Sequence, residues 1–92
     1  MNIPSAVKAG IGSPDPTKPF HVLCGAYESE IYAIKRAKEL MSNGFTNLII
    51  GEYNGMYRVS LGGYKTREDA DLALDKFKEK VPQAWFFKWP NR

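Results

Sequence analysis

The chain has 92 residues, of which 43% are hydrophobic and 25% are charged, and its net charge is +3. These values predict one folded domain, exclude disorder over the whole length and suit an acidic or neutral partner surface better than a nucleic acid. One cysteine, one histidine and no apolar run of about 18 residues argue against a disulfide framework, a metal site, a His-based triad and a membrane-spanning helix.

The first 19 residues differ from the rest of the chain because they hold four of the six prolines. Proline fixes φ and lacks a backbone donor, so neither a regular helix nor a central strand is predicted over 1–19. We interpret this segment as a flexible arm or linker, with few ordered residues before Lys18. The alternative is a segment that docks on the domain, with Ile3, Val7 and Ile11 lying over the sheet.

A strand, a helix and a second strand are predicted after the arm. Hydrophobic residues predict the first strand over 20–24, ending at Gly25. Apolar residues at helical spacing predict a helix near Ser29–Asn43, with the serine as N-cap, and Gly44 can take the left-handed conformation that ends it. The second strand is predicted over 46–52.

The second half of the chain repeats this order. Asn54-Gly55 is a strong hairpin signal, and it leads into a strand predicted over 56–61. A capping motif and an apolar stripe predict a helix near Thr66–Lys80, and the last strand is predicted over 84–89.

The two halves align without gaps at an offset of 37 residues. At this offset Gly25 meets Gly62 and Tyr27 meets Tyr64. Two β-α-β halves with the same turns predict an α+β, ferredoxin-like (split β-α-β) sandwich, in which a four-stranded antiparallel sheet carries two helices on one face. We expect this domain to span 20–89, followed by a short tail over 90–92.

Two motifs resemble those of SPOR domains, the sporulation-related repeat. The first, similar to the family's Y-x-V-Q-V-G-S-F, is Phe20-x-Val22-x-Cys24-Gly25-Ala26-Tyr27. The second, similar to the family's G-L-Y-R-V-x-V-G-P-F, is Asn54-Gly55-Met56-Tyr57-Arg58-Val59-x-Leu61-Gly62-Gly63-Tyr64. The resemblance covers about 20–89, and it also includes Ala33, Leu40, Gly44, Ala70 and Trp85.

The resemblance implies a non-catalytic module of the bacterial cell envelope that binds peptidoglycan glycan strands stripped of stem peptides. Such a module would sit in the periplasm within a longer protein and direct it to the division site. Three polar positions of the family, a Gln, a Ser and an Asn, are here Leu23, Ala26 and Tyr32. The apolar replacements leave open an alternative, a protein-interaction or homodimerisation module that has lost glycan binding.

Strand alternation assigns side chains to the two faces of the sheet. The helix-facing residues are expected to be Val22, Cys24, Val59, Leu61, Ile49 and Phe86. The other face then carries the candidate glycan-binding residues, which are His21, Leu23, Leu48, Ile50, Arg58, Ser60, Trp85, Phe87 and Trp89. Aromatic rings can stack on the C–H face of a sugar, while Arg, His and Ser can donate to its hydroxyl groups.

Other interpretations of these residues stay open. Trp85 and Phe87 could cover a small core beneath the proline-rich arm or form a homodimer contact, and Tyr27 and Tyr64 are expected to pack where strand meets helix. RNA binding is disfavoured because the central strands carry no exposed aromatic residue. No nucleophile–base constellation and no phosphate-binding glycine loop is present, so we expect no enzyme.

Overall fold

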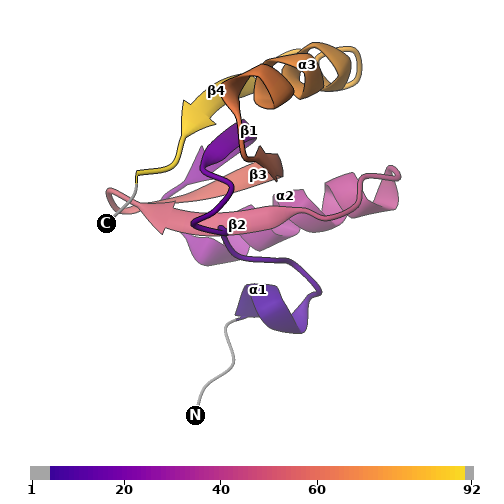
Figure 1. Ribbon diagram of the computed structural model, residues 1–92. Helices are drawn as coiled ribbons and strands as arrows, with labels where there is room; N and C mark the ends of the chain where they lie inside the picture. The colour runs from indigo at the N-terminus through magenta and orange to yellow at the C-terminus, as the bar shows by residue number, and fades with distance from the viewer. Residues whose placement is uncertain (1–4, 91–92) are drawn as a thin grey trace.

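The computed structural model describes residues 5–90. From Phe20 onward its helices and strands follow the predicted order, whereas a one-turn helix over Ser5–Lys8 lies in the segment for which no helix was predicted. Figure 1 labels each element along the chain. The elements are α1 (Ser5–Lys8), β1 (Phe20–Tyr27), α2 (Glu30–Ser42), β2 (Ile49–Tyr53), β3 (Met56–Tyr64), α3 (Arg67–Phe77) and β4 (Trp85–Lys88).

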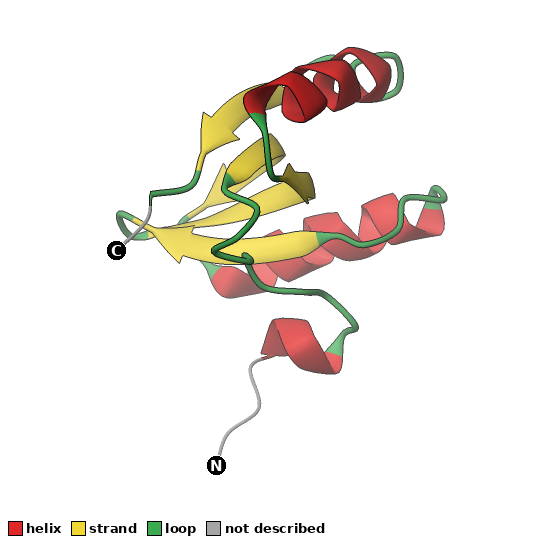
Figure 2. Ribbon diagram, in the orientation of Figure 1, coloured by secondary structure: helices red, strands yellow, loops and turns green. Residues whose placement is uncertain are grey.

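The four strands form one antiparallel sheet in the order β2-β3-β1-β4. Figure 2 shows the strands in yellow and the helices in red. Residues of both α2 and α3 pack against the same core, which includes Val22, Cys24, Val59 and Leu61. The predicted ferredoxin-like sandwich is therefore confirmed.

The turns and helix ends obey their local chemistry, with one exception. Asn54 and Gly55 have positive φ angles of 53° and 75° in the β2–β3 hairpin, and Gly44 has a φ of 95° after α2. Thr66 Oγ1 accepts a hydrogen bond from the Asp69 backbone N–H at 3.1 Å, as its capping motif predicts. Ser29 occupies the N-cap of α2, but its side chain makes no capping hydrogen bond.

The glycine and tyrosine of each half pack together. A Cβ atom on Gly25 would lie 2.8 Å from the Tyr27 ring, and one on Gly62 would lie 2.8 Å from the Tyr64 hydroxyl. Each tyrosine therefore folds back over the glycine two residues before it. This confirms the structural role expected for both tyrosines, and it explains why both halves repeat Gly-x-Tyr.

The pairing between the two central strands, β1 and β3, contains two register shifts. The β1–β3 pairing skips Leu61 between Val22 and Leu23, and it skips Cys24 between Leu23 and Gly25. Each skipped residue is an extra one in its strand, which is the signature of a β-bulge. Both extra side chains lie in the helix-side core.

The assignment of β2 side chains to faces was wrong. Leu48 and Ile50 are buried in the helix-side core, whereas they were expected on the opposite face. Ile50 pairs with Val59, and Ile49 pairs with Ser60, one residue away from the pairing that the 37-residue repeat implies. A slip of one residue moves every side chain of a strand to the other face.

The segment before β1 docks on the domain at the β2 edge. The backbone N–H of Gly12 donates to the Leu48 carbonyl at 2.9 Å, and the Ile50 N–H donates to the Gly12 carbonyl at 3.0 Å. Ile11 is only 2% exposed and belongs to the helix-side core. The expectation of few ordered residues before Lys18 is therefore wrong.

The docked alternative describes this segment, although Ile11 packs beside the edge of the sheet rather than over it. Figure 1 shows α1 and the following loop on the side of β2 and α2. Ile3 and the side chain of Val7 lie outside the described residues.

The missing side chain of Gly51 lets Pro14 and Trp89 pack against β2 on the face of the sheet opposite the helices, here called the second face. A Cβ atom at this position would lie 2.5 Å from Pro14 and from the ring of Trp89. Two segments from opposite ends of the chain therefore meet over one glycine of β2.

Replacing this glycine should loosen the contact. We expect Gly51→Ala to lower the free energy of unfolding by about 1–3 kcal/mol, as overpacking typically does. Chemical denaturation measures this change, with Gly12→Ala as a matched control because a Cβ there meets nothing closer than 3.7 Å. Equal stability of the two variants would show that Trp89 does not pack on Gly51.

Candidate functional site

The second face carries a layer of aromatic rings around one arginine. The guanidinium carbon of Arg58 lies 5.1 Å from the ring centroid of Phe87 and 5.7 Å from that of Tyr53. Trp89 meets Phe87 edge to face at 5.4 Å and lies 6.4 Å from Tyr53. We call these four residues, Tyr53, Arg58, Phe87 and Trp89, the aromatic layer.

Trp89 extends this layer across the sheet from the β4 edge. Its backbone N–H donates to the Pro19 carbonyl at 2.7 Å, which ties the chain after β4 to the segment before β1. Its ring lies 5.6 Å from His21 on β1 and contacts Gly51 on β2. One indole therefore covers positions on two strands that are not neighbours in the sheet.

A polar network lies under Trp89. The Ser60 hydroxyl donates to the Gly62 carbonyl at 3.0 Å and accepts from the Gly62 N–H at 3.2 Å. His21 Nδ1 lies 2.8 Å from the same hydroxyl oxygen, so the two side chains are hydrogen-bonded to each other. His21 Nε2 is buried and has no hydrogen-bond partner among the described residues.

The buried environment keeps this ring neutral. Burial lowers the pKa of His21 below its usual value, and the nearby Lys18 carbonyl opposes that shift only in part. The side chain is fully buried. His21 is therefore a structural residue of the second face and does not reach solvent as a ligand-binding group would.

Five of the nine predicted site residues cannot contact a ligand in this structure. His21, Leu23 and Ser60 lie on the second face as predicted, but all three have no exposed surface. Leu48 and Ile50 lie on the helix side. The prediction failed at these positions because it treated the second face as open, whereas Trp89 and the docked segment cover much of it.

The remaining four predicted residues lie together on the second face. Trp85 is 37% exposed, while Arg58, Phe87 and Trp89 are half-buried. Trp85 pairs with Leu23, two residue pairs beyond His21 and Phe87 and therefore on the same face. The exposed part of this face is therefore a shelf at the β4 edge, and the expected groove between β4 and β2 is filled by side chains.

Tyr53 was missed as a member of this surface. It shares the second face with Ile49 and Gly51, because alternate residues of a strand point the same way. The residue itself carries no signal beyond its aromatic ring. Only the correct β2 register would have placed it beside Arg58.

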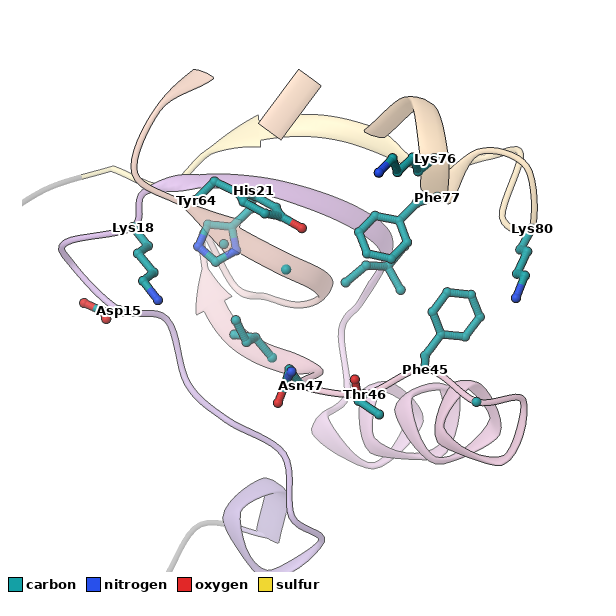
Figure 3. A pocket seen from close by; sticks show the side chains of 15 residues that line it. Asp15, Lys18, His21, Phe45, Thr46, Asn47, Tyr64, Lys76, Phe77 and Lys80 are labelled. Carbon is teal, nitrogen blue, oxygen red and sulfur yellow. The ribbon is translucent and has the colours of Figure 1, made fainter. Parts of the chain in front are cut away.

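A separate cleft of about 670 Å³ lies where β1 begins and β3 ends. Figure 3 shows it from close by, with the labelled side chains that line it. Its walls come from the docked segment, the loop between α2 and β2, and the end of α3. Gly62 and Gly63 line it from β3, so the backbone itself forms part of the wall.

Reactive groups are sparse in the described part of the chain. Burial raises the pKa of the Cys24 thiol to about 11, so the reactive thiolate is scarce at neutral pH. Among residues 5–90 no group of three or more His, Cys, Asp and Glu side chains could hold a metal ion. None of the described helices is long and apolar enough to cross a membrane.

The depressed pKa of His21 predicts an acid-sensitive fold. The unfolded chain takes up a proton near a pKa of about 6.5 while the folded ring resists it, so stability is retained above that pH and falls below it. Denaturation of the wild type and His21→Gln should show a steeper loss in the wild type between about pH 7.5 and about pH 5. Equal losses would contradict a buried neutral ring.

Comparison with known protein families matches residues 16–88 to the SPOR domain. Comparisons with curated proteins and with solved structures find no match. The match covers well over half of the chain and includes all four strands of the sheet together with α2 and α3. The chain therefore belongs to the SPOR domain family, a family of bacterial cell-envelope domains known for binding peptidoglycan.

Proposed function

We propose that this domain binds glycan strands of peptidoglycan at the β4 edge of the second face and so directs a longer envelope protein to the division site. The preferred strands are those stripped of stem peptides, and the compartment is the periplasm. The observation that carries the proposal is the exposed indole of Trp85 beside the aromatic layer. Membership of a peptidoglycan-binding family supports it.

The shelf combines an apolar ring face with a cation. A tryptophan ring packs against the C–H face of a pyranose with little loss of side-chain entropy, because it has only two rotatable angles. Arg58 is held between the rings of Tyr53 and Phe87, so it is ordered before a ligand arrives. Its half-buried guanidinium can donate to hydroxyl or acetamido oxygens at the edge of a sugar.

The buried residues support this shelf from below. His21 and Ser60 hydrogen-bond to each other, and the fully buried Leu23 is the β1 partner of Trp85. A ligand-binding surface needs such a rigid foundation, since order present before binding reduces the entropy lost on binding. We assign these three residues to positioning rather than to sugar contact.

A second candidate function uses the same shelf. Leu23 and Ala26 replace polar residues of the family, and the exposed Trp85, which pairs with Leu23, favours an apolar partner such as a second copy of this chain. The two candidates predict different behaviour when the tryptophan is removed.

The proposal predicts that Trp85→Ala weakens binding to purified sacculi at least about tenfold, or about 1.4 kcal/mol, because stacking area is lost. Co-sedimentation with sacculi, with and without amidase pretreatment, measures this effect, and the pretreated sacculi should bind more protein. Leu72→Ala is the control, since this apolar residue of α3 is 65% exposed and lies on a helix, away from the second face. Unchanged binding by the Trp85 variant would refute a glycan shelf.

Sedimentation equilibrium on the same proteins tests the second candidate. If Trp85→Ala converts a dimer to a monomer while sacculus binding stays intact, the shelf is an oligomer contact. If the wild type is monomeric and its sacculus binding depends on Trp85, the glycan shelf is supported.

A further inference from the structure

The cleft at the start of β1 is chemically unlike the shelf. Its interior is apolar and aromatic, with Phe45 from the loop after α2 and Phe77 from α3 facing each other at 6.1 Å. Ile49, Leu61 and Tyr64 add further apolar surface from the sheet. Thr46 and Asn47 place a hydroxyl and an amide in the same wall.

Three lysines surround this interior. Figure 3 shows Lys18 beside Asp15 at one end of the cleft, and Lys76 and Lys80 at the end where Phe45 and Phe77 lie. Within residues 5–90, no lysine of the cleft lies within 4.0 Å of a carboxylate oxygen. The cleft therefore has positive charge that the described part of the chain does not neutralise at contact distance.

The carboxylate in the cleft is already engaged locally. Asp15 Oδ1 accepts hydrogen bonds from the Thr17 N–H at 2.8 Å and from the Thr17 hydroxyl at 2.7 Å. These bonds lower the pKa of Asp15 and keep it charged. One fixed negative charge opposes three positive charges, which leaves the lining of the cleft with a net charge of +2.

His21 closes one wall of the cleft without exposing a polar atom. Its side chain belongs to the lining but has no exposed surface, and Gly63 packs closely on it, since a Cβ there would lie 2.9 Å from His21 Cε1. The polar side chains that a ligand can reach in this wall are those of Thr46 and Asn47, which are exposed.

We propose that this cleft binds a sugar ring that carries an anionic group. The lysines at either end bind the carboxylate or phosphate, the aromatic floor packs against the ring, and hydroxyl groups meet the exposed side chains of Thr46 and Asn47. The volume of about 670 Å³ accommodates a ring of this size. The choice of a wall sugar rests on the proposed function, whereas the requirement for an anion rests on the cleft alone.

Titration of the isotope-labelled protein with three sugars tests the proposal by NMR. N-acetylmuramic acid and N-acetylglucosamine share the same ring, but only the first carries a lactyl carboxylate. N-acetylglucosamine 6-phosphate carries a phosphate on that ring. We expect the two anionic sugars to shift the amide signals of Asn47, Gly62 and Gly63, and the neutral sugar to leave them unchanged. The stronger of the two anionic probes identifies which anion the cleft selects.

A pair of charge-matched variants locates the binding. Lys76→Ala/Lys80→Ala should weaken binding of the anionic sugar roughly tenfold, which corresponds to about 1.4 kcal/mol. Lys35→Ala/Lys38→Ala removes the same charge from exposed positions of α2 outside the cleft, and it should bind as the wild type does. Equal effects of the two pairs, or equal shifts with the neutral sugar, would overturn the proposal.

Failure of this site and failure of the shelf are distinguishable. Trp85→Ala should leave the monosaccharide titration unchanged, because Trp85 does not line the cleft. A wild type that binds the anionic sugars but not sacculi would refute the proposed glycan site on the shelf and support the anionic-sugar site in the cleft. If the sugars shift the amide signals of Trp85 and Phe87 and not those of the cleft, the anionic-sugar site in the cleft is refuted and the glycan site on the shelf is supported.

Discussion

The contact between Trp89 and Gly51 determines what the second face of this sheet can do. A four-stranded sheet with helices on one side leaves its other side to solvent unless something covers it. Here the indole lies against a glycine of β2 and beside His21 of β1. Because the ring spans the sheet, the residues beneath it become a second, small core.

This second core has consequences for its polar members. His21 and Ser60 are fully buried, so their hydrogen bonds must be made inside the protein. The Ser60 hydroxyl is hydrogen-bonded to the backbone of Gly62 and to the ring of His21. His21 also belongs to the lining of the cleft, so the foundation of the shelf and the proposed anion site share this residue.

The docked segment solves a different problem, the exposed edge of β2. Unpaired N–H and C=O groups at a sheet edge invite pairing with other chains. Gly12 hydrogen-bonds to the backbone of the residues on either side of Ile49, namely Leu48 and Ile50. The neighbouring Ile11 packs in the helix-side core. In a domain of this size, such additional burial adds substantially to a small core. The proline-rich composition of 1–19 excludes a long strand but allows these local contacts.

The sequence alone determined the order of elements, the turns and the family. These features depend on local chemistry: positive φ at Asn54-Gly55, the threonine cap of α3, and the repeated Gly-x-Tyr that places Tyr27 and Tyr64 over their glycines. Only the tertiary structure decided which residues reach solvent. Bulges at Cys24 and Leu61, the one-residue offset of β2 and the fold-back of Trp89 depend on contacts between segments far apart in the chain. Alternation within a single strand carries no information about such contacts, which is why Leu48 and Ile50 were assigned to the wrong face and Tyr53 was missed.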